Sequence, residues 1–171
     1  MKITTIAAAV LLSTTSTAFA QTYFDEFTPL STSQTSALPA AAPIKLSSPN
    51  ISQVTLANRA NQNALTPGQD SGNWDMITAN ETGADAGRYL FMPFETGSGG
   101  VMRVDLQDSN YNTRTTTIVA PGTQGFVSGD ASRWTPWGSY VTAEESWGTG
   151  STKGRLFEVT NPTTAGQFTG D

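Results

Sequence analysis

The chain has 171 residues, a formal net charge of −5 and neither cysteine nor histidine. The missing residue types exclude disulfides, zinc sites of the usual Cys/His kind, and catalysis by a histidine base or a thiol nucleophile. The acidic balance gives no reason to expect a nucleic acid or an anionic membrane as a partner. Any chemistry must therefore rest on carboxylates, hydroxyls, Lys and Arg, or on hard metal ions.

The first twenty residues have the pattern of a secretory signal peptide. Lys2 precedes the apolar run Ile6–Leu12, and small residues follow, ending in Ala18-Phe19-Ala20. These are the basic, apolar and A-x-A parts of a cleavable signal, and the apolar run is too short to span a bilayer. We expect cleavage after Ala20, and a secreted or periplasmic protein without a membrane span.

Residues 21–72 form the next compositional block. They are rich in Ser, Thr, Ala, Pro, Asn and Gln, as in "STSQTSALPAAAPIKLSSPN", and no helical period persists. Such a composition is typical of extended, loop-rich structure. The sequence predicts a loop-rich N-terminal segment with at most one short strand, at Gln53–Ala57.

Residues 73–171 contain short apolar or alternating runs separated by Gly, Asn, Asp and Ser, a spacing that predicts an antiparallel all-β fold. The runs are Asp75–Asn80, Arg88–Phe94, Val101–Leu106, Thr115–Ala120, Ser139–Ala143 and Gly154–Thr160. The first four make one meander, which is the unit of a β-propeller blade. After a long loop at 121–138, the last two begin a second blade. The prediction is a partial β-propeller of about one and a half blades.

A propeller closes with four or more blades, and a single blade cannot bury both of its faces. We therefore expect residues 73–171 to be the N-terminal part of a longer, truncated propeller domain. The alternative is a small sandwich or barrel that is complete as it stands.

Several of these strands end in glutamate before a glycine-rich turn. Because successive antiparallel strands leave a sheet at opposite ends, strand counting places Glu81 with Glu144 and Glu145 at one rim and Glu95 at the other. Clustered carboxylates without histidine suit calcium. A solvated strand end is the alternative, and it is the favoured reading for Glu95. Asp130, in "SGDASRW", is either a further ligand or a turn aspartate.

Three tryptophans lie in the same region, at Trp134, Trp137 and Trp147. Tryptophan supplies a large apolar surface with one polar group, and it serves both cores and ligand platforms. The sequence favours core and loop packing for these three residues over a role as sugar platforms.

The run Trp134–Glu145, "WTPWGSYVTAEE", resembles the "TPWGTWLTCEE"-type motif of the PhoX-like alkaline phosphatase family. The stretches "GRYLFMPFETGSGGVMRVDLQ" and "GRLFEVTNP" are also similar to its N-terminal blades, so the resemblance covers roughly Phe24–Pro162. It implies a secreted bacterial β-propeller that hydrolyses small phosphate esters with calcium and iron in its central channel. On that pattern Glu144 and Glu145 match a metal-binding Glu-Glu pair.

One departure from the family pattern lies at Asp130, where the resemblance places a cysteine iron ligand. Aspartate is a harder ligand than cysteine, and it changes the redox character of a bound iron. We therefore expect a divergent member, with Glu144, Glu145, Asp130 and Glu81 as metal ligands. The full-length protein would be a metal-dependent phosphatase and this fragment inactive. The alternatives are a non-catalytic secreted propeller with structural calcium, and a free-standing secreted β-domain.

Overall fold

The computed structural model describes residues 28–49, 51–60 and 73–167. The predicted signal peptide, residues 1–20, lies outside this range. The chain divides into two compact units, Met1–Gln53 and Val54–Asp171. The described part of the first unit consists of turns, bends and irregular chain, in which the Gln53 side chain forms hydrogen bonds with both backbone groups of Ile44. The predicted strand at Gln53–Ala57 does not form, because no described strand pairs with it.

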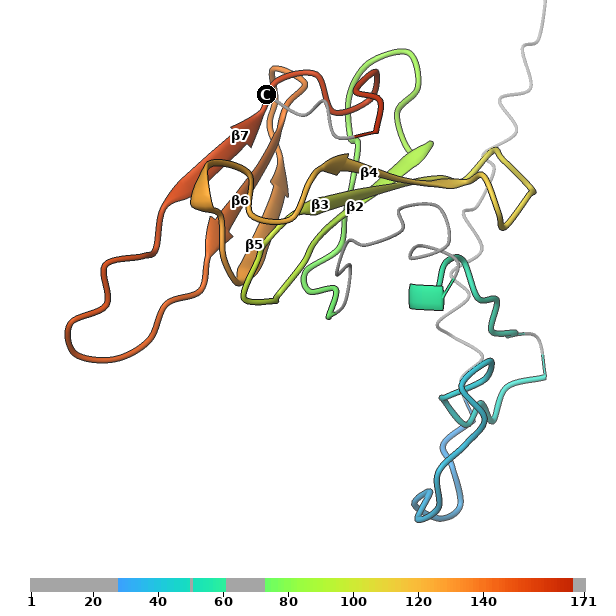
Figure 1. The fold of residues 1–171 in the computed structure, drawn as a ribbon. Coiled ribbons are helices and arrows are strands. Elements are labelled where there is room, and N and C mark those ends of the chain that lie inside the picture. Colours follow the sequence, from blue (N-terminus) through green and yellow to red (C-terminus); the bar gives the residue numbers. More distant parts are fainter. Residues whose placement is uncertain (1–27, 50, 61–72, 168–171) are drawn as a thin grey trace, which may run out of the picture. The chain divides into compact units, whose positions relative to one another are not determined.

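The second unit begins with a four-stranded antiparallel meander in the order β1-β2-β3-β4. Its strands are β1 (Thr78–Ala79), β2 (Tyr89–Pro93), β3 (Val101–Asp105) and β4 (Thr115–Val119). A bridge between Trp74 and Phe94 continues the pairing beyond β1. This sheet is the predicted first meander, with all four strands in place (Figure 1).

A second antiparallel sheet follows the short 3-10 turn η2 (Thr123–Gly125), in the order β5-β6-β7. Its strands are β5 (Gly129–Trp134), β6 (Tyr140–Glu144) and β7 (Leu156–Val159). The all-β prediction is confirmed, but the second sheet has three strands where the sequence predicted two. The segment predicted as a loop contains β5, which pairs with β6 from Ser132↔Thr142 to Trp134↔Tyr140.

The core lies between the two sheets. Phe91 of β2 is fully buried, and its ring centroid is 5.6 Å from that of Trp134 and 5.4 Å from that of Tyr140. Burying side chains of this size contributes roughly 1.5–3 kcal/mol each. β5 is the strand of the second sheet that lies against β1 and β2. The first strands of the two sheets, β1 and β5, are thus neighbours.

A second apolar cluster covers the other face of the first sheet. Met92, Phe94, Met102 and Val104 are buried there, and Trp74 packs against them. The first sheet is therefore covered on both faces. On the outer face of the second sheet, by contrast, Leu156 of β7 is 71% exposed. Within the described ranges, no helix has the length and apolar character needed to cross a membrane.

Candidate functional site

The extra strand β5 changes which strand ends meet. With β5 in place, β6 is the second strand of its sheet and ends at the same side as β2. The Gly129 amide donates to the Phe94 carbonyl at 2.9 Å, and the Glu145 amide donates to the Ser128 carbonyl at 2.8 Å. Glu145 therefore lies beside Glu95. The rim assignment from strand counting was wrong because the count lacked β5.

Four half-buried carboxylates meet at this end, and we call them the acidic rim. They are Asp75 before β1, Glu95 after β2, Asp130 in β5 and Glu145 after β6. The pKa of Glu95 is raised, first by a hydrogen bond with the Glu145 side chain, then by desolvation and by the neighbouring negative charges. The pKa of Asp130 is raised by desolvation first and then by the charges of Asp75 and Glu145. Either a proton or a cation would relieve this crowding.

The acidic rim fits calcium by the chemistry of its donors, which are all hard carboxylate oxygens. The fit to iron is poorer, since the position that the resemblance assigns to cysteine is Asp130, a harder ligand. Across residues 28–49, 51–60 and 73–167, however, no group of three or more Asp, Glu, His or Cys side chains is arranged to hold a metal ion. The rim is thus a convergence of carboxylates rather than a formed coordination sphere.

Glu144 has a different environment from its neighbour. Its side chain is fully buried, Arg155 Nη2 donates to its Oε1 at 2.7 Å, and Arg155 Nε donates to its Oε2 at 3.1 Å. The backbone amides of Val127, Gly154 and Arg155 donate to the same carboxylate at 3.0–3.2 Å. These bonds, Arg155 first, lower the pKa of Glu144 to about 2. A metal ion at Glu144 would have to displace Arg155.

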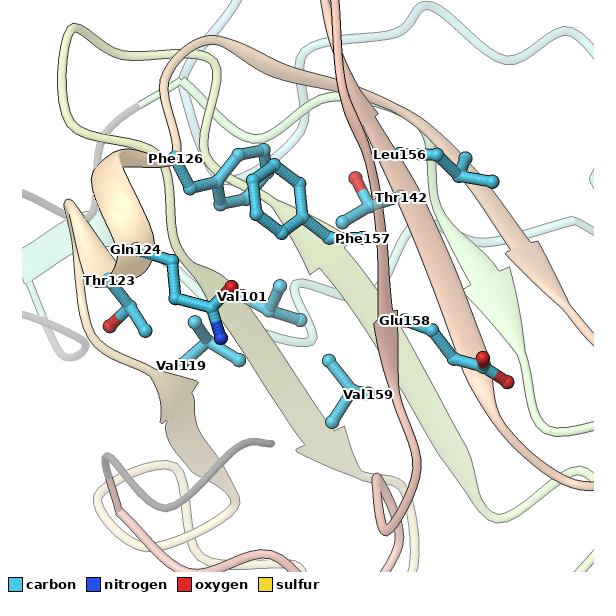
Figure 2. A pocket seen from close by; sticks show the side chains of 10 residues that line it. All are labelled: Val101, Val119, Thr123, Gln124, Phe126, Thr142, Leu156, Phe157, Glu158 and Val159. Atoms are coloured by element: carbon cyan, nitrogen blue, oxygen red, sulfur yellow. The ribbon is translucent and has the colours of Figure 1, made fainter.

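Arg155 also ties the second sheet to the turn η2. Its guanidinium donates to the carbonyls of Gln124 at 3.0 Å and Gly125 at 2.7 Å. The turn forms one wall of a cleft of about 190 Å³, on whose other side Phe157 and Val159 of β7 lie (Figure 2). The ion pair of Glu144 and Arg155 is therefore part of the framework between the sheets.

Glu81 lies away from the acidic rim. It is exposed, and its Oε1 is 4.0 Å from Nη1 of Arg133, near the end of β5. The next residue, Thr82, accepts a hydrogen bond of 2.9 Å from the Trp134 indole. Of the four predicted ligands, the structure brings Asp130 and Glu145 together, holds Glu144 in an ion pair, and leaves Glu81 at the other end of the sheet.

Asp75 and Glu95 were missed as candidates. Glu95 carried the same signal as the other strand ends, a glutamate before a glycine-rich turn. It was set aside because strand counting placed it at the opposite rim and because a solvated strand end was the favoured interpretation. Asp75 carried no signal of its own in the sequence. Its place follows from the pairing of Trp74 with Phe94, which aligns it with the end of β2.

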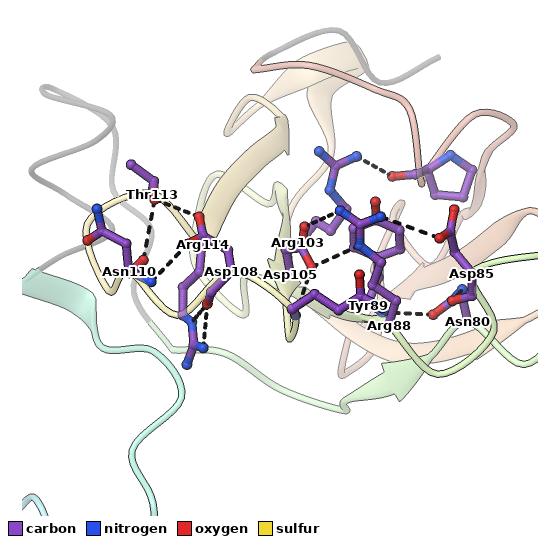
Figure 3. Close-up of polar contacts among 12 residues, drawn as sticks. Asn80, Asp85, Arg88, Tyr89, Arg103, Asp105, Asp108, Asn110, Thr113 and Arg114 are labelled. Atoms are coloured by element: carbon purple, nitrogen blue, oxygen red, sulfur yellow. Dashed lines mark hydrogen bonds and ion pairs between the residues drawn. The ribbon is translucent and has the colours of Figure 1, made fainter.

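Other aspartates of the described region have structural roles (Figure 3). Arg88 holds Asp105 with bonds of 2.7 and 3.0 Å, and this pairing lowers the pKa of Asp105. Asp108 accepts hydrogen bonds from the Thr113 hydroxyl and from the Asn110 amide, and these bonds, Thr113 first, lower its pKa. Both carboxylates stabilise loop turns at the ends of β2, β3 and β4.

A scan against protein-family models finds no match, and searches of the curated proteins and of the solved structures find none either.

Proposed function

We propose that this chain forms two neighbouring sheets of a secreted, PhoX-like β-propeller that binds calcium at the acidic rim. The observation that carries the proposal is the convergence of four carboxylates from both sheets, two of which have raised pKa values. A divalent cation would offset their repulsion and link the two sheets. The contact of β5 with β1 and β2 supports the arrangement, because the inner strands of adjacent blades approach a common axis.

In the whole protein, the proposed activity is hydrolysis of small phosphate esters. Bound calcium and iron would supply charge to stabilise the phosphoryl group and to activate a water molecule. The contribution of this chain would be to supply Glu95, Asp130 and Glu145, which would have to close around the cation, and to fix the strand ends that carry them. We assign no catalytic residue to the described region.

A non-catalytic propeller with structural calcium is the second candidate. Asp130 at the position of the family cysteine favours it, as does the engagement of Glu144 by Arg155. In that case the rim keeps its role in joining the sheets, and no phosphate ester is turned over.

Calcium titration of thermal unfolding tests the cation site. If Kd is about 0.1 mM, as in extracellular calcium modules, 10 mM calcium should stabilise the protein by about 2.7 kcal/mol and raise Tm by roughly 10 °C. Asp130→Asn and Glu95→Gln should each reduce this rise. Glu81→Gln is the matched control, since it removes an acid outside the rim and should leave the rise intact.

The proposal fails if calcium leaves the Tm of the wild-type chain unchanged, or if the Glu81→Gln variant loses the rise as fully as the Asp130→Asn variant. Activity is measured separately, on the protein as it is secreted, with calcium, iron and p-nitrophenyl phosphate. Turnover that a calcium chelator abolishes supports the phosphatase. A calcium-dependent Tm without turnover supports the non-catalytic propeller.

A further inference from the structure

Strained backbone gathers around the strand-end glutamates. Among the described residues, three that are not glycine have a left-handed backbone, with φ between 43° and 53°: Asn73, Gln124 and Ser128. This conformation is unfavourable for an L-amino acid, and it persists only where the surrounding structure imposes it. The carbonyl of each accepts a hydrogen bond from the amide of Glu95 or Glu145, or from Arg155, the partner of Glu144. All three strained residues therefore hold a group at the end of β2 or β6.

Ser128 differs from the other two because its backbone bonds to both sheets. Its amide donates to the Thr96 carbonyl at 2.7 Å, just beyond the end of β2. Its carbonyl accepts from the Glu145 amide at 2.8 Å, just beyond the end of β6. Thr96 directly follows Glu95 in the chain. One residue thus links the two chain segments that carry Glu95 and Glu145.

The neighbours of Ser128 impose its conformation. A Cβ added at the next residue, Gly129, would lie 2.7 Å from Cζ of Phe126 and 2.8 Å from Cβ of Pro93. The Gly129 amide also donates to the Phe94 carbonyl at 2.9 Å. With Gly129 held against the end of β2, the left-handed turn at Ser128 directs its carbonyl toward the end of β6. Serine favours this turn less than asparagine or glycine does, and strain of this kind is typical of functional sites.

We infer that Ser128 is a positioning residue of the acidic rim, whose left-handed backbone holds Glu95 and Glu145 side by side. In the unbound protein, this arrangement shortens the movement by which the carboxylates would close around a cation. The consequence for calcium affinity rests on the proposed calcium site. A turn residue that contributes only to folding is the alternative, and it predicts no change in calcium affinity when the turn is perturbed.

The first measurement is the calcium Kd of Ser128 variants, by calorimetric titration at a temperature where circular dichroism shows each to be folded. Ser128→Val introduces a β-branched residue, which is an outlier at positive φ. Its Kd should rise by about tenfold, because re-forming a strained turn takes up binding free energy. Ser128→Thr keeps the hydroxyl and should raise Kd in the same direction, which covers a valine variant that does not fold. Ser128→Asn tolerates the left-handed region and should keep the wild-type Kd.

Gly87→Val is the matched control. Gly87 has a φ of 79°, it lies in the turn before β2 at the end away from the rim, and nothing lies within 4 Å of an added Cβ. The substitution creates the same backbone strain, so it should lower Tm in EDTA and leave the calcium Kd unchanged. Equal rises in Kd for Gly87→Val and Ser128→Val would overturn the inference, and so would an unchanged Kd in the folded Ser128 variants.

A second measurement does not depend on calcium. The chain contains no cysteine, so thiol spin labels can be placed specifically at Gly97→Cys and Ser146→Cys, close to the two rim glutamates. In EDTA, Ser128→Val should broaden the distance distribution between the labels, whereas Gly87→Val should not. If the wild-type chain binds no calcium but the labels respond in this way, the proposed calcium site fails and Ser128 still positions the strand ends. If the wild-type chain binds calcium but neither Kd nor the label distances respond to Ser128, only the positioning role fails.

Discussion

Replacing Glu144 with glutamine separates a structural role of this carboxylate from a metal-binding one. Glutamine keeps the shape, but its NH₂ group must take the place of one carboxylate oxygen. If it takes the place of Oε1, the Val127 amide and Arg155 Nη2 both lose their acceptor. Breaking a buried ion pair costs roughly 3–5 kcal/mol. Because the Arg155 side chain is 44% exposed and can turn to water, we expect a loss of about 3 kcal/mol.

The assay is urea and thermal unfolding at pH 7 in EDTA, so that no metal contributes. A loss of about 3 kcal/mol corresponds to a fall in Tm of roughly 10 °C for a unit of this size. Glu81→Gln serves as the control and should change Tm little, because it removes an exposed, weakly paired charge.

The pH dependence gives an independent signature of the same ion pair. The folded-state pKa of Glu144 is about 2, below its ordinary value of 4.5. Its contribution is therefore fully present above about pH 4.5 and is lost as the pH falls toward 2. The difference in unfolding free energy between the wild-type and Glu144→Gln proteins should shrink over that interval.

The opposite pattern would refute this reasoning. If the Glu144→Gln variant unfolds at the wild-type urea concentration in EDTA but binds calcium more weakly, then Glu144 is a metal ligand as the family resemblance implies. In that case a metal ion could replace Arg155 as the partner of the Glu144 carboxylate, and the ion pair with Arg155 would not be what stabilises the buried charge.

Two further substitutions test the packing that positions the site. Phe91→Ala removes the ring that Trp134 stacks on and should cost about 4 kcal/mol in urea unfolding, whereas a loss below about 1 kcal/mol would contradict a close-packed interface between the sheets. Gly129→Ala places a Cβ 2.7 Å from Cζ of Phe126 and should destabilise by about 2 kcal/mol. Gly97→Ala, with no atom within 4 Å of the new Cβ, should be neutral by comparison; equal effects from the two glycines would exclude the steric explanation.

The strands that could be predicted are those whose own residues form an apolar or alternating run. Val101–Leu106 alternates between the two faces of its sheet, and β3 forms there. β5 could not be predicted, because Gly129–Trp134 reads as small and polar residues with a single large apolar one. It becomes a strand through tertiary contacts: Trp134 stacks on Phe91, and Ser132 pairs across to Thr142.

The unpredicted strand β5 changed the candidate site more than it changed the fold. One uncounted strand reverses the end at which every later strand leaves the sheet. The prediction listed Asp130 and Glu145 among four metal ligands and placed Glu95 at the opposite rim, whereas the structure places all three together. The residue types indicate which kind of ligand the site would bind. Which carboxylates lie together depends on the number of strands between them, and that number is hard to predict when strands are short and irregular.

The adjacent residues Glu144 and Glu145 show how one strand end can serve two electrostatic purposes. Glu144 lies inside the strand pairing, where Arg155 and three backbone amides stabilise its charge. Glu145 lies one residue beyond, where its hydrogen bond with Glu95 raises the pKa of Glu95. The pKa of Asp130 is raised by desolvation first, and the charges of Asp75 and Glu145 add to that shift. At neutral pH the charge of Glu144 stabilises the packing of the two sheets, whereas the charge of Glu145 destabilises it. A cation bound at the acidic rim would therefore offset the charge of Glu145 and leave Glu144 unaffected. Because carboxyls with raised pKa values take up protons first as the pH falls, any calcium stabilisation should weaken before the contribution of Glu144 is lost.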